Sequence, residues 1–233
     1  MRLGLCCLFH DQPIQFRQTT AKALKRLGRR SQLVRLSQLC LANVQSLKTA
    51  LQWLESKHIG TFRVLSPLFP RYTHPEVAYH IEELPDAEIL FNELVAIKNF
   101  RKKHDIRLSL HPDQFNVLSS PHEHVIANTL RELEYQGYLA ELIGAEVINI
   151  HAGGGYGNKN KALDRFKNSF GQLSDRVKSR LAIENDDTTY SPKDLLPLCR
   201  SISRPLVYDV HHHRCLPDSL SVEDATEQCI QSW

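Results

Sequence analysis

Six short apolar segments alternate with longer amphipathic segments along this chain, and this alternation limits the possible folds more than any other feature of the sequence. The apolar segments are rich in leucine and β-branched residues, as strands are, and they cover residues 2–9, 61–65, 107–111, 146–151, 180–184 and 205–209. Repeated strand–helix–strand order is typical of parallel strands joined by crossover helices. The sequence therefore predicts either a closed (β/α) barrel or an open doubly wound sheet.

Helical periodicity fills the intervals between the strand-like segments. Apolar residues recur every three or four positions from Leu33 to Leu54 and again from Leu163 to Val177, so each stretch is expected to be a helix. Another helix is expected over Pro121 to Ile143. A further helix should begin after Ser191, because a serine N-cap followed by Pro192 at the first helical position is a typical helix start.

Polar residues stand where four of the strand-like segments end, at His111, His151, Glu184 and Asp209. Loops open away from the packed core at the carboxyl ends of parallel strands, so reactive groups gather there. The first strand is not followed by the G-x-G-x-x-G fingerprint of a dinucleotide-binding sheet. We therefore predict a TIM-type (β/α) barrel, with six strand–helix units in this chain.

Imidazoles and carboxylates that converge on one face are suitable ligands for a divalent metal such as Mn²⁺, Zn²⁺, Fe²⁺ or Mg²⁺. A charged carboxylate at a barrel mouth is also costly to bury without a cation beside it. Three consecutive histidines, residues 211–213, follow Asp209, and spacing leaves open which of them joins a metal site. Asp186 and Asp187 are expected to shape a turn or to orient the histidines.

Two loops next to these strand ends could contact a ligand. The amides of Gly153, Gly154 and Gly155 could approach a phosphate, although the same glycines would also suit a tight turn. Gln114 and Phe115 place an amide beside an aromatic ring that could wedge into a base stack, or could simply anchor a loop on the barrel rim.

Basic residues gather between positions 22 and 35 and include Lys25 and Arg26. This region is expected to be the loop after the first strand, on the rim that carries the metal ligands. It could therefore hold a phosphate backbone, although a solvated charged surface is the commoner cause of such a cluster.

The composition fits a globular protein and excludes few partners. With 233 residues, 42% of them hydrophobic, the chain is expected to fold as one domain over residues 1–233. A net charge of +3 neither requires nor excludes a polyanionic partner. The apolar runs are far shorter than the roughly 20 residues of a membrane-spanning helix, and no secretory signal is recognisable, so we expect a cytoplasmic protein without a membrane partner. No feature indicates an obligate protein partner.

Several motifs, in this order along the chain, resemble the UV damage endonuclease family. They are RLGLCCLF, LFPRYTHPEV, LSLHPDQF, ELEYQ, INIHAGGGYGNK, RLAIENDD, DLLPLC and PLVYDVHHHRC. The resemblance implies a TIM-type barrel that binds divalent metals, typically Mn²⁺ with Mg²⁺, Zn²⁺ or Co²⁺ as alternatives. It also implies an endonuclease for DNA repair that nicks UV-damaged double-stranded DNA immediately 5′ of pyrimidine dimers and related lesions.

The resemblance also implies roles for individual residues. Gln114 and Phe115 correspond to the pair that wedges into the duplex at the lesion. The water that attacks the scissile phosphate would be held at the metals by Glu184, Asp209 and His151. The residues that match family metal ligands are His74, His111, His151, Glu184, Asp209 and His212.

Two departures from the family pattern accompany the resemblance. Leu5 and Phe9 stand where many family members have a tyrosine and an asparagine that help to hold the lesion. Family members also continue beyond the position of Trp233 into two more βα units with further metal ligands, so this chain is expected to be short at its C-terminal side. Two other hypotheses therefore stay open: an inactive fragment that binds damaged DNA, and a metal-dependent enzyme similar to sugar isomerases.

Overall fold

A computed structural model describes residues 2–233 of the chain. The chain forms two compact units. Unit 1 comprises Met1–His111 and Tyr138–Glu146, and unit 2 comprises Pro112–Gly137 and Val147–Trp233. That residues 1–233 form a single domain stays a prediction.

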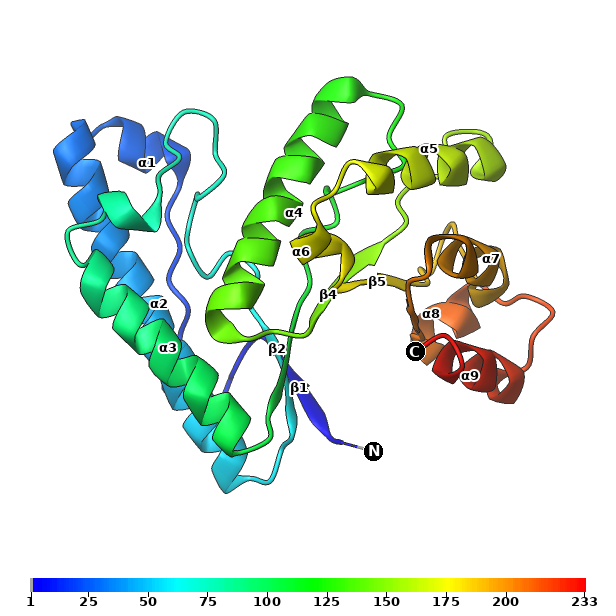
Figure 1. The fold of residues 1–233 in the computed structure, drawn as a ribbon, viewed down its shortest axis with the longest axis horizontal. Helices are drawn as coiled ribbons and strands as arrows, with labels where there is room; N and C mark the ends of the chain where they lie inside the picture. The colour runs from blue at the N-terminus through cyan, green and yellow to red at the C-terminus, as the bar shows by residue number, and fades with distance from the viewer. Residues whose placement is uncertain (1) are drawn as a thin grey trace. The chain divides into compact units, whose positions relative to one another are not determined.

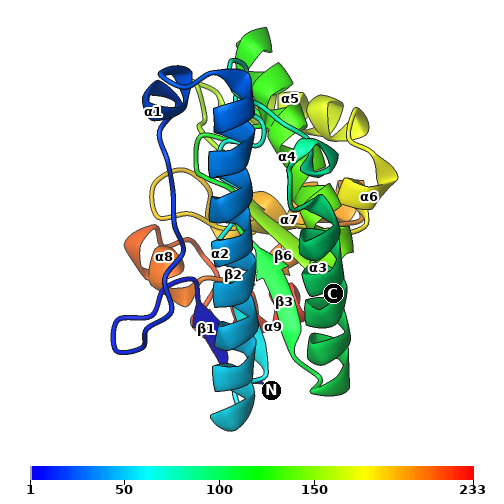
Figure 2. The same ribbon diagram turned by 90° about the vertical axis from the view of Figure 1, so that its left-hand side faces the viewer.

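The strands follow one another in the order β1-β2-β3-β4-β5-β6 (Figure 1; β3 and β6 are labelled in Figure 2). Pairing is parallel between β1 and β2, β2 and β3, β4 and β5, and β5 and β6. This order, with helices between successive strands, confirms the predicted TIM-type architecture, and the described residues supply six strands where a closed barrel has eight. All six expected strands are present, each shorter than its apolar segment: β1 Gly4–Cys6, β2 Thr61–Val64, β3 Arg107–Leu110, β4 Val147–His151, β5 Leu181–Glu184 and β6 Leu206–Val207.

Helices occupy the intervals that the periodicity indicated. No helix among residues 2–233 combines the length and the apolar character that a membrane crossing requires. The helices of the described chain, including one 3-10 turn named η1, are α1 Ala21–Lys25, α2 Arg29–Ser56, η1 Ile81–Glu83, α3 Ala87–Lys103, α4 Glu123–Ile143, α5 Lys159–Gly171, α6 Asp175–Lys178, α7 Pro192–Ile202, α8 Val210–Cys215 and α9 Val222–Ile230.

The long helix expected near residues 163–177 is in fact two helices, α5 and α6. The helix breaks because Ser174 turns toward α4, where the Glu134 carboxylate accepts hydrogen bonds from its backbone N–H (3.1 Å) and from its hydroxyl (2.9 Å). Ser174 then serves as the N-cap residue of α6. The apolar period continues across the break since Leu173 and Val177 are both buried, which is why the sequence pattern hides it.

Unit 1 has its core between the strands and the pair α2 and α3, which lie side by side (Figure 2). The face of α2 that repeats at three- and four-residue spacing is fully buried, as is Phe62 of β2. At an order of 1.5–3 kcal/mol for each large side chain removed from water, this face is the main source of stability for α2. The buried residues of that face include Leu36, Cys40, Val44, Leu47, Leu51 and Leu54.

The basic segment near residue 25 is not the loop that the sequence predicted. It forms α1 and the first turns of α2, and Arg26 is the exposed C-cap residue of α1. Two of its cations form ion pairs: Lys25 with Glu76 (2.5 Å) and Arg29 with Glu83 (2.8 Å). The prediction placed these residues in a loop because helix α1 is too short to show a periodic apolar pattern.

Helix α7 of unit 2 begins as predicted. Its N-cap residue Ser191 and the third helical residue Asp194 form a reciprocal capping box, with Pro192 at the first helical position. Helices α7 and α9 pack against each other and against β6 (Figure 1). The side chains of Ser232 and Trp233 bond to the backbone of Leu206, as acceptor for its N–H (2.9 Å) and donor to its carbonyl (3.1 Å) respectively. The short strand β6 is therefore held by helices and side chains as well as by its pairing with β5.

A charge cluster in unit 1 fixes the entry to β4. The Glu146 N–H donates to the Leu108 carbonyl (2.9 Å), and its carboxylate accepts from Arg101 (2.6 Å) and Arg107 (2.5 Å). Burial alone would raise the pKa of Glu146, but the two guanidinium groups outweigh it and hold that pKa below its usual value.

We predict that Glu146→Gln lowers the free energy of unfolding by about 1 kcal/mol at pH 7, since the carboxylate is partly exposed and screened. A lowered folded-state pKa stabilises the fold above the unfolded-state pKa of about 4.3, and this stabilisation is lost as the pH falls further through the folded-state value. The difference in unfolding free energy between the wild type and Glu146→Gln, measured with urea, should therefore be smaller at pH 3.5 than at pH 7. The control Asp11→Asn, at an exposed carboxylate, should unfold with nearly the same free energy as the wild type at both pH values. A loss of stability for Glu146→Gln that is as large at pH 3.5 as at pH 7 would contradict the prediction.

Candidate metal centre and the loops around it

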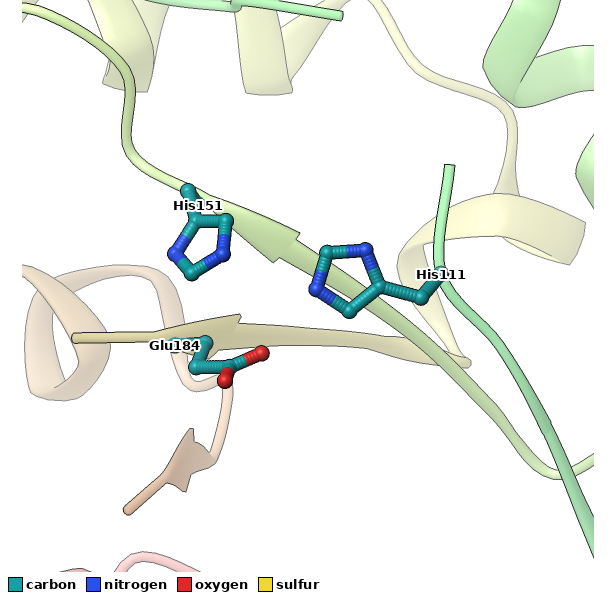
Figure 3. Close-up of side chains that lie close together, drawn as sticks. All are labelled: His111, His151 and Glu184. Atoms are coloured by element: carbon teal, nitrogen blue, oxygen red, sulfur yellow. The ribbon is translucent and has the colours of Figure 1, made fainter. Parts of the chain in front are cut away.

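The carboxyl ends of β4, β5 and β6 bring the predicted ligands of unit 2 to one edge. β4 ends at His151 and β5 ends at Glu184, and the parallel register pairs these two residues directly (Figure 3). Glu184 in turn pairs with Val207, and Asp209 follows two residues later. The three side chains share an edge because parallel strands in register end at the same level.

Glu184, Asp209 and His212 form a group whose ligand atoms all lie within 4.8 Å of one another. The Nδ1 atom of His212 is 3.9 Å from Glu184 Oε1 and 3.7 Å from Asp209 Oδ2. The His151 ring lies beside them, with its centroid 5.6 Å from that of His212. Within unit 2, the structure thus brings together four of the six ligands that the family resemblance implied.

Asp209 reaches this group as the N-cap residue of α8. Its Oδ1 atom accepts hydrogen bonds from the backbone N–H groups of His211 (2.8 Å) and His212 (2.9 Å). An N-cap carboxylate satisfies amides that have no partner inside the helix and is favoured by the helix dipole. The same bonds fix where the His212 side chain leaves the helix.

Asn185 ties Asp209 and His212 to the end of β5, and the sequence interpretation missed it. Its side-chain amide donates to the Asp209 carbonyl (2.9 Å) and accepts from the Asp209 N–H (2.8 Å). The Asn185 backbone carbonyl lies 2.9 Å from His212 Nδ1. A carbonyl can only accept, so Nδ1 carries the proton in this contact and Nε2 keeps the lone pair that a metal needs.

Glu184 is the most deeply placed ligand, with 7% of its side chain exposed. The side-chain amide of Asn149, two residues before the end of β4, donates a hydrogen bond to Glu184 Oε2. An amide orients a carboxylate without neutralising it. The one sequence signal for Asn149 and Asn185 is an asparagine beside a strand-end ligand, which is too common to be specific.

The three consecutive histidines have three different surroundings. His211 is exposed, with Nε2 3.9 Å from Cys215 Sγ. His213 is buried, and its ring nitrogens face the Tyr208 hydroxyl (2.7 Å) and Asp218 Oδ1 (3.2 Å). Of these three histidines, only His212 belongs to a group of potential ligands among the described residues, so the geometry favours it; that it binds a metal stays a prediction.

Asp218, the carboxylate partner of His213, has a lowered pKa. Its burial would raise the pKa, but hydrogen bonds from the N–H groups of Leu220 (2.7 Å) and Lys193 (2.9 Å), together with His213, favour the charged form more strongly. The His213–Asp218 contact therefore belongs to the packing of α8 against the segment that follows it.

Asp186 and Asp187 lie in a turn, which was one of the two roles predicted for them; the other was to orient the histidines. Asp186 accepts hydrogen bonds from the backbone N–H groups of Thr188 (2.9 Å), Thr189 and Tyr190 (3.1 Å). Asp187 is exposed. The residue that orients a histidine is Asn185 rather than either aspartate.

His111 and His74 lie in unit 1. His111 directly follows β3 (Figure 3), and its N–H donates to the Ser66 hydroxyl (3.1 Å). His74 lies in the loop between β2 and η1, where its Nδ1 accepts from the Glu76 N–H (3.2 Å). Among residues 2–233, His74 belongs to no group of potential ligands.

The segment after β3 holds Gln114 and Phe115 outward. Asp113 organises a turn, since its carboxylate accepts from the Phe115 N–H (3.0 Å) and its carbonyl accepts from the Asn116 N–H (2.9 Å). Gln114 is exposed, and Phe115 is 77% exposed. The alternative of a loop anchor packed on the rim is therefore wrong for the Phe115 ring.

The glycine loop after His151 is a locked turn. Gly153 has φ +86°, and a Cβ there would come within 2.3 Å of Val117 Cγ1. The Ser119 hydroxyl donates to the Ala152 carbonyl (2.7 Å), and the Tyr190 hydroxyl donates to the Gly154 carbonyl (3.4 Å). Burial raises the pKa of Tyr190 to about 12, so this hydroxyl keeps its proton at neutral pH. Gly155 accepts at its carbonyl from the Asn158 N–H (2.9 Å).

The chemistry of the donor set fits a divalent cation. Two carboxylates and two imidazoles give oxygen and nitrogen ligands of the kind that Mn²⁺, Fe²⁺, Co²⁺ and Zn²⁺ accept. The proton on His212 Nδ1 leaves its other nitrogen available. The Asn149 amide orients the Glu184 carboxylate without neutralising its charge, and Asn185 fixes the backbone of Asp209.

Parallel strands in chain order, with imidazole and carboxylate ligands grouped where they end, define the class of this protein: a TIM-type α/β protein with a candidate metal centre. A family model described as "UV-endonuclease UvdE" matches residues 1–233, and the chain belongs to this family.

Relatives and a solved structure agree with that assignment. The chain is 35% identical to a UV-damage endonuclease of Schizosaccharomyces pombe, covering 94% of this chain and 37% of that protein. It is 30% identical to a UV DNA damage endonuclease of Bacillus velezensis, covering 97% of this chain and 70% of the relative. The crystal structure of SacUVDE superimposes with a TM-score of 0.90 at 30% identity, over 100% of this chain and 77% of the other.

More distant structures share the fold alone. Endonuclease IV from Thermus thermophilus has a TM-score of 0.57 at 17% identity, covering 79% of this chain and 67% of its own. A D-psicose 3-epimerase also reaches 0.57, at 16% identity, covering 78% and 63%. Endonuclease IV and the epimerase match this chain equally well, so their likeness shows the fold and carries no information on activity.

Two glycine substitutions separate crowding from backbone strain in the loop after β4. Gly157→Ala should cost about 1 kcal/mol of unfolding free energy, because Gly157 has φ +76° and open space around a Cβ. Gly153→Ala should cost about 2–4 kcal/mol, because its Cβ would also collide with Val117 and Ser119. Urea unfolding measures both, and equal losses would contradict the described packing.

Alanine substitutions at His211 and His213 test the different surroundings of these two histidines. His213→Ala should lower the unfolding free energy by about 2–3 kcal/mol, since it leaves the buried Asp218 contact unmade. His211→Ala should change it by less than about 0.5 kcal/mol, because the side chain is exposed. Thermal and urea unfolding would contradict the assignment if the two variants were equally stable.

Proposed function

We propose that this chain is a metal-dependent endonuclease for DNA repair that nicks UV-damaged double-stranded DNA immediately 5′ of pyrimidine dimers and related lesions. The observation that carries the proposal is the group formed by Glu184, Asp209 and His212 at the strand ends of a chain that the family model matches throughout. The chain spans little more than a third of the S. pombe relative, so the activity of that whole protein is part of the proposal.

The residues that would hold the metal come from four successive strand ends, from one loop and from helix α8. When bound, divalent cations, in the first place Mn²⁺ and otherwise Mg²⁺, Zn²⁺ or Co²⁺, polarise the scissile phosphate and lower the pKa of the attacking water. We assign the ligand role to His74, His111, His151, Glu184, Asp209 and His212.

The chain's own groups would supply orientation and charge. Glu184, Asp209 and His151 would hold the attacking water in place opposite the leaving 3′ oxygen. Asn149 fixes the Glu184 carboxylate, and Asn185 fixes both the backbone of Asp209 and the tautomer of His212. Removal of such a supporting hydrogen bond typically lowers metal affinity or activity by roughly 10- to 100-fold.

DNA would contact the loops that flank these strand ends. Gln114 and Phe115 would wedge into the duplex at the lesion, where a ring that is 77% exposed in the free protein gains apolar contact with unstacked bases. The amides near Gly153, Gly154 and Gly155 would approach the phosphate backbone. Lys25 and Arg26 are exposed, and Lys25 would have to exchange its ion pair with Glu76 for a phosphate.

Nicking of supercoiled plasmid tests the proposal. We expect the protein to relax UV-irradiated plasmid in Mn²⁺, to leave unirradiated plasmid intact, and to lose activity in chelator. Glu184→Gln should reduce nicking by at least about 100-fold, because it removes one ligand charge at the buried centre. The matched control Asp187→Asn, an exposed turn carboxylate three residues away, should nick like the wild type.

The other outcomes are equally informative. Retention of irradiated plasmid without nicking would favour an inactive fragment that binds damaged DNA. Indifference to damage would contradict both DNA hypotheses, and metal-dependent conversion of a ketose by the same preparation would favour the enzyme similar to sugar isomerases.

A further inference from the structure

We propose that Tyr156, in the glycine loop after β4, is a stacking platform for a nucleobase displaced from the duplex. This inference rests on the proposed function and adds a contact residue to it. Tyr156 is 48% exposed and stands five residues after His151, on the loop that leaves the edge of the candidate metal centre.

The backbone of Tyr156 is in a conformation that tyrosine rarely adopts. Its φ is +46°, in the left-handed region, where a non-glycine residue costs about 1–2 kcal/mol. Glycine stands on both sides, at Gly155 and Gly157, so the loop places a large ring at a position where glycine would cost less. Strain of this kind persists where the surroundings fix it and is concentrated at functional sites.

The ring contacts two neighbouring groups and is about half exposed. The Arg165 guanidinium lies 5.5 Å from the ring centroid, within cation–π range. The ring also packs on Gly154, where a Cβ would lie 3.4 Å from Tyr156 Cε2. Arg165 is itself anchored by donating from Nε to the Ser119 carbonyl (2.8 Å). A held aromatic ring binds a base with little further loss of side-chain entropy.

Hydrogen bonds of Ser119 connect Arg165 with the backbone of the glycine loop. Ser119 links the Arg165 anchor to the loop, because its hydroxyl donates to the Ala152 carbonyl while its own carbonyl accepts from Arg165. Replacing Gly154 or Gly153 would disturb these contacts. Tyr156 therefore combines two properties of a stacking residue, an aromatic ring that is about half exposed and a position fixed by its neighbours.

The favoured ligand is a nucleobase, because every base offers a π face and the surroundings are cationic. Lys161 is exposed in the first turn of α5 and could meet the phosphate of the same nucleotide. Lys159 is less available, since its ammonium group bonds to Asp194 (2.9 Å).

Binding to a duplex with one synthetic thymine dimer, with 2-aminopurine opposite the lesion and Ca²⁺ in place of Mn²⁺, tests the inference. Tyr156→Asn should weaken binding to this duplex about 5- to 150-fold, the range of one lost base–aromatic stack. Its affinity for an undamaged duplex should stay within about twofold, because backbone contacts are unchanged. Tyr156→Phe should keep the wild-type affinity. It should also quench the fluorescence of 2-aminopurine as much as the wild type does, because phenylalanine keeps the aromatic ring.

The variants control for folding and for unspecific effects. Asparagine accepts the left-handed region better than tyrosine does, so Tyr156→Asn should unfold at a urea concentration no lower than the wild type. Ile89→Asn, an equally exposed apolar residue on α3, should leave DNA binding unchanged.

Three results would overturn the inference while leaving the proposed function standing: wild-type affinity of Tyr156→Asn for the lesion duplex, equal losses for damaged and undamaged duplexes, or a loss by Tyr156→Phe as large as that by Tyr156→Asn. If the wild-type protein itself does not distinguish the lesion duplex from the undamaged one, the proposed function fails and this inference fails with it.

Discussion

The two-way hydrogen bond between the Asn185 side chain and the backbone of Asp209 is the contact on which the candidate metal centre depends. Strand β6 has only two residues, so pairing with β5 ends at Val207, before Asp209 is reached. The Asn185 amide bonds to the backbone of Asp209, two residues beyond that pairing, and thereby places Asp209 as the cap of α8. His212 follows from the position of the cap, because α8 begins where Asp209 accepts its first N–H groups.

The sequence predicted the fold well because its signals were local and repeated. Six apolar segments correspond to six strands, and the predicted ligands His111, His151, Glu184 and Asp209 follow one another at strand ends. Prediction was weaker where a long-range contact decides the outcome. Glu134 breaks the expected helix at Ser174, and the basic residues near Lys25 lie in helices and ion pairs rather than in an open loop. Neither contact leaves a trace in a local pattern, since each joins residues about 40 or more positions apart.

The candidate site shows the same division between local and distant information. Which of three adjacent histidines faces Glu184 is a question of helix geometry: His212 and His213 differ by one position and leave α8 in different directions. Periodicity could not decide this without the start of the helix, and that start depends on Asn185. Motif resemblance indicated His212 without explaining it, and the hydrogen bonds of Asp209 supply the physical reason.

The choice of neutral amides as supporting groups has an electrostatic consequence. A lysine or arginine in place of Asn149 could also donate to the Glu184 carboxylate, but it would compete with a cation for the charge of that carboxylate. At Asn185 neither could accept from the Asp209 N–H, because both side chains only donate. Amides hold Glu184 and Asp209 in place and leave both negative charges directed at the same small region. Because burial makes such charges costly, the arrangement favours a divalent cation over a monovalent one and over water alone. The positions of two asparagines thus connect the strand register of unit 2 with the metal chemistry proposed for it.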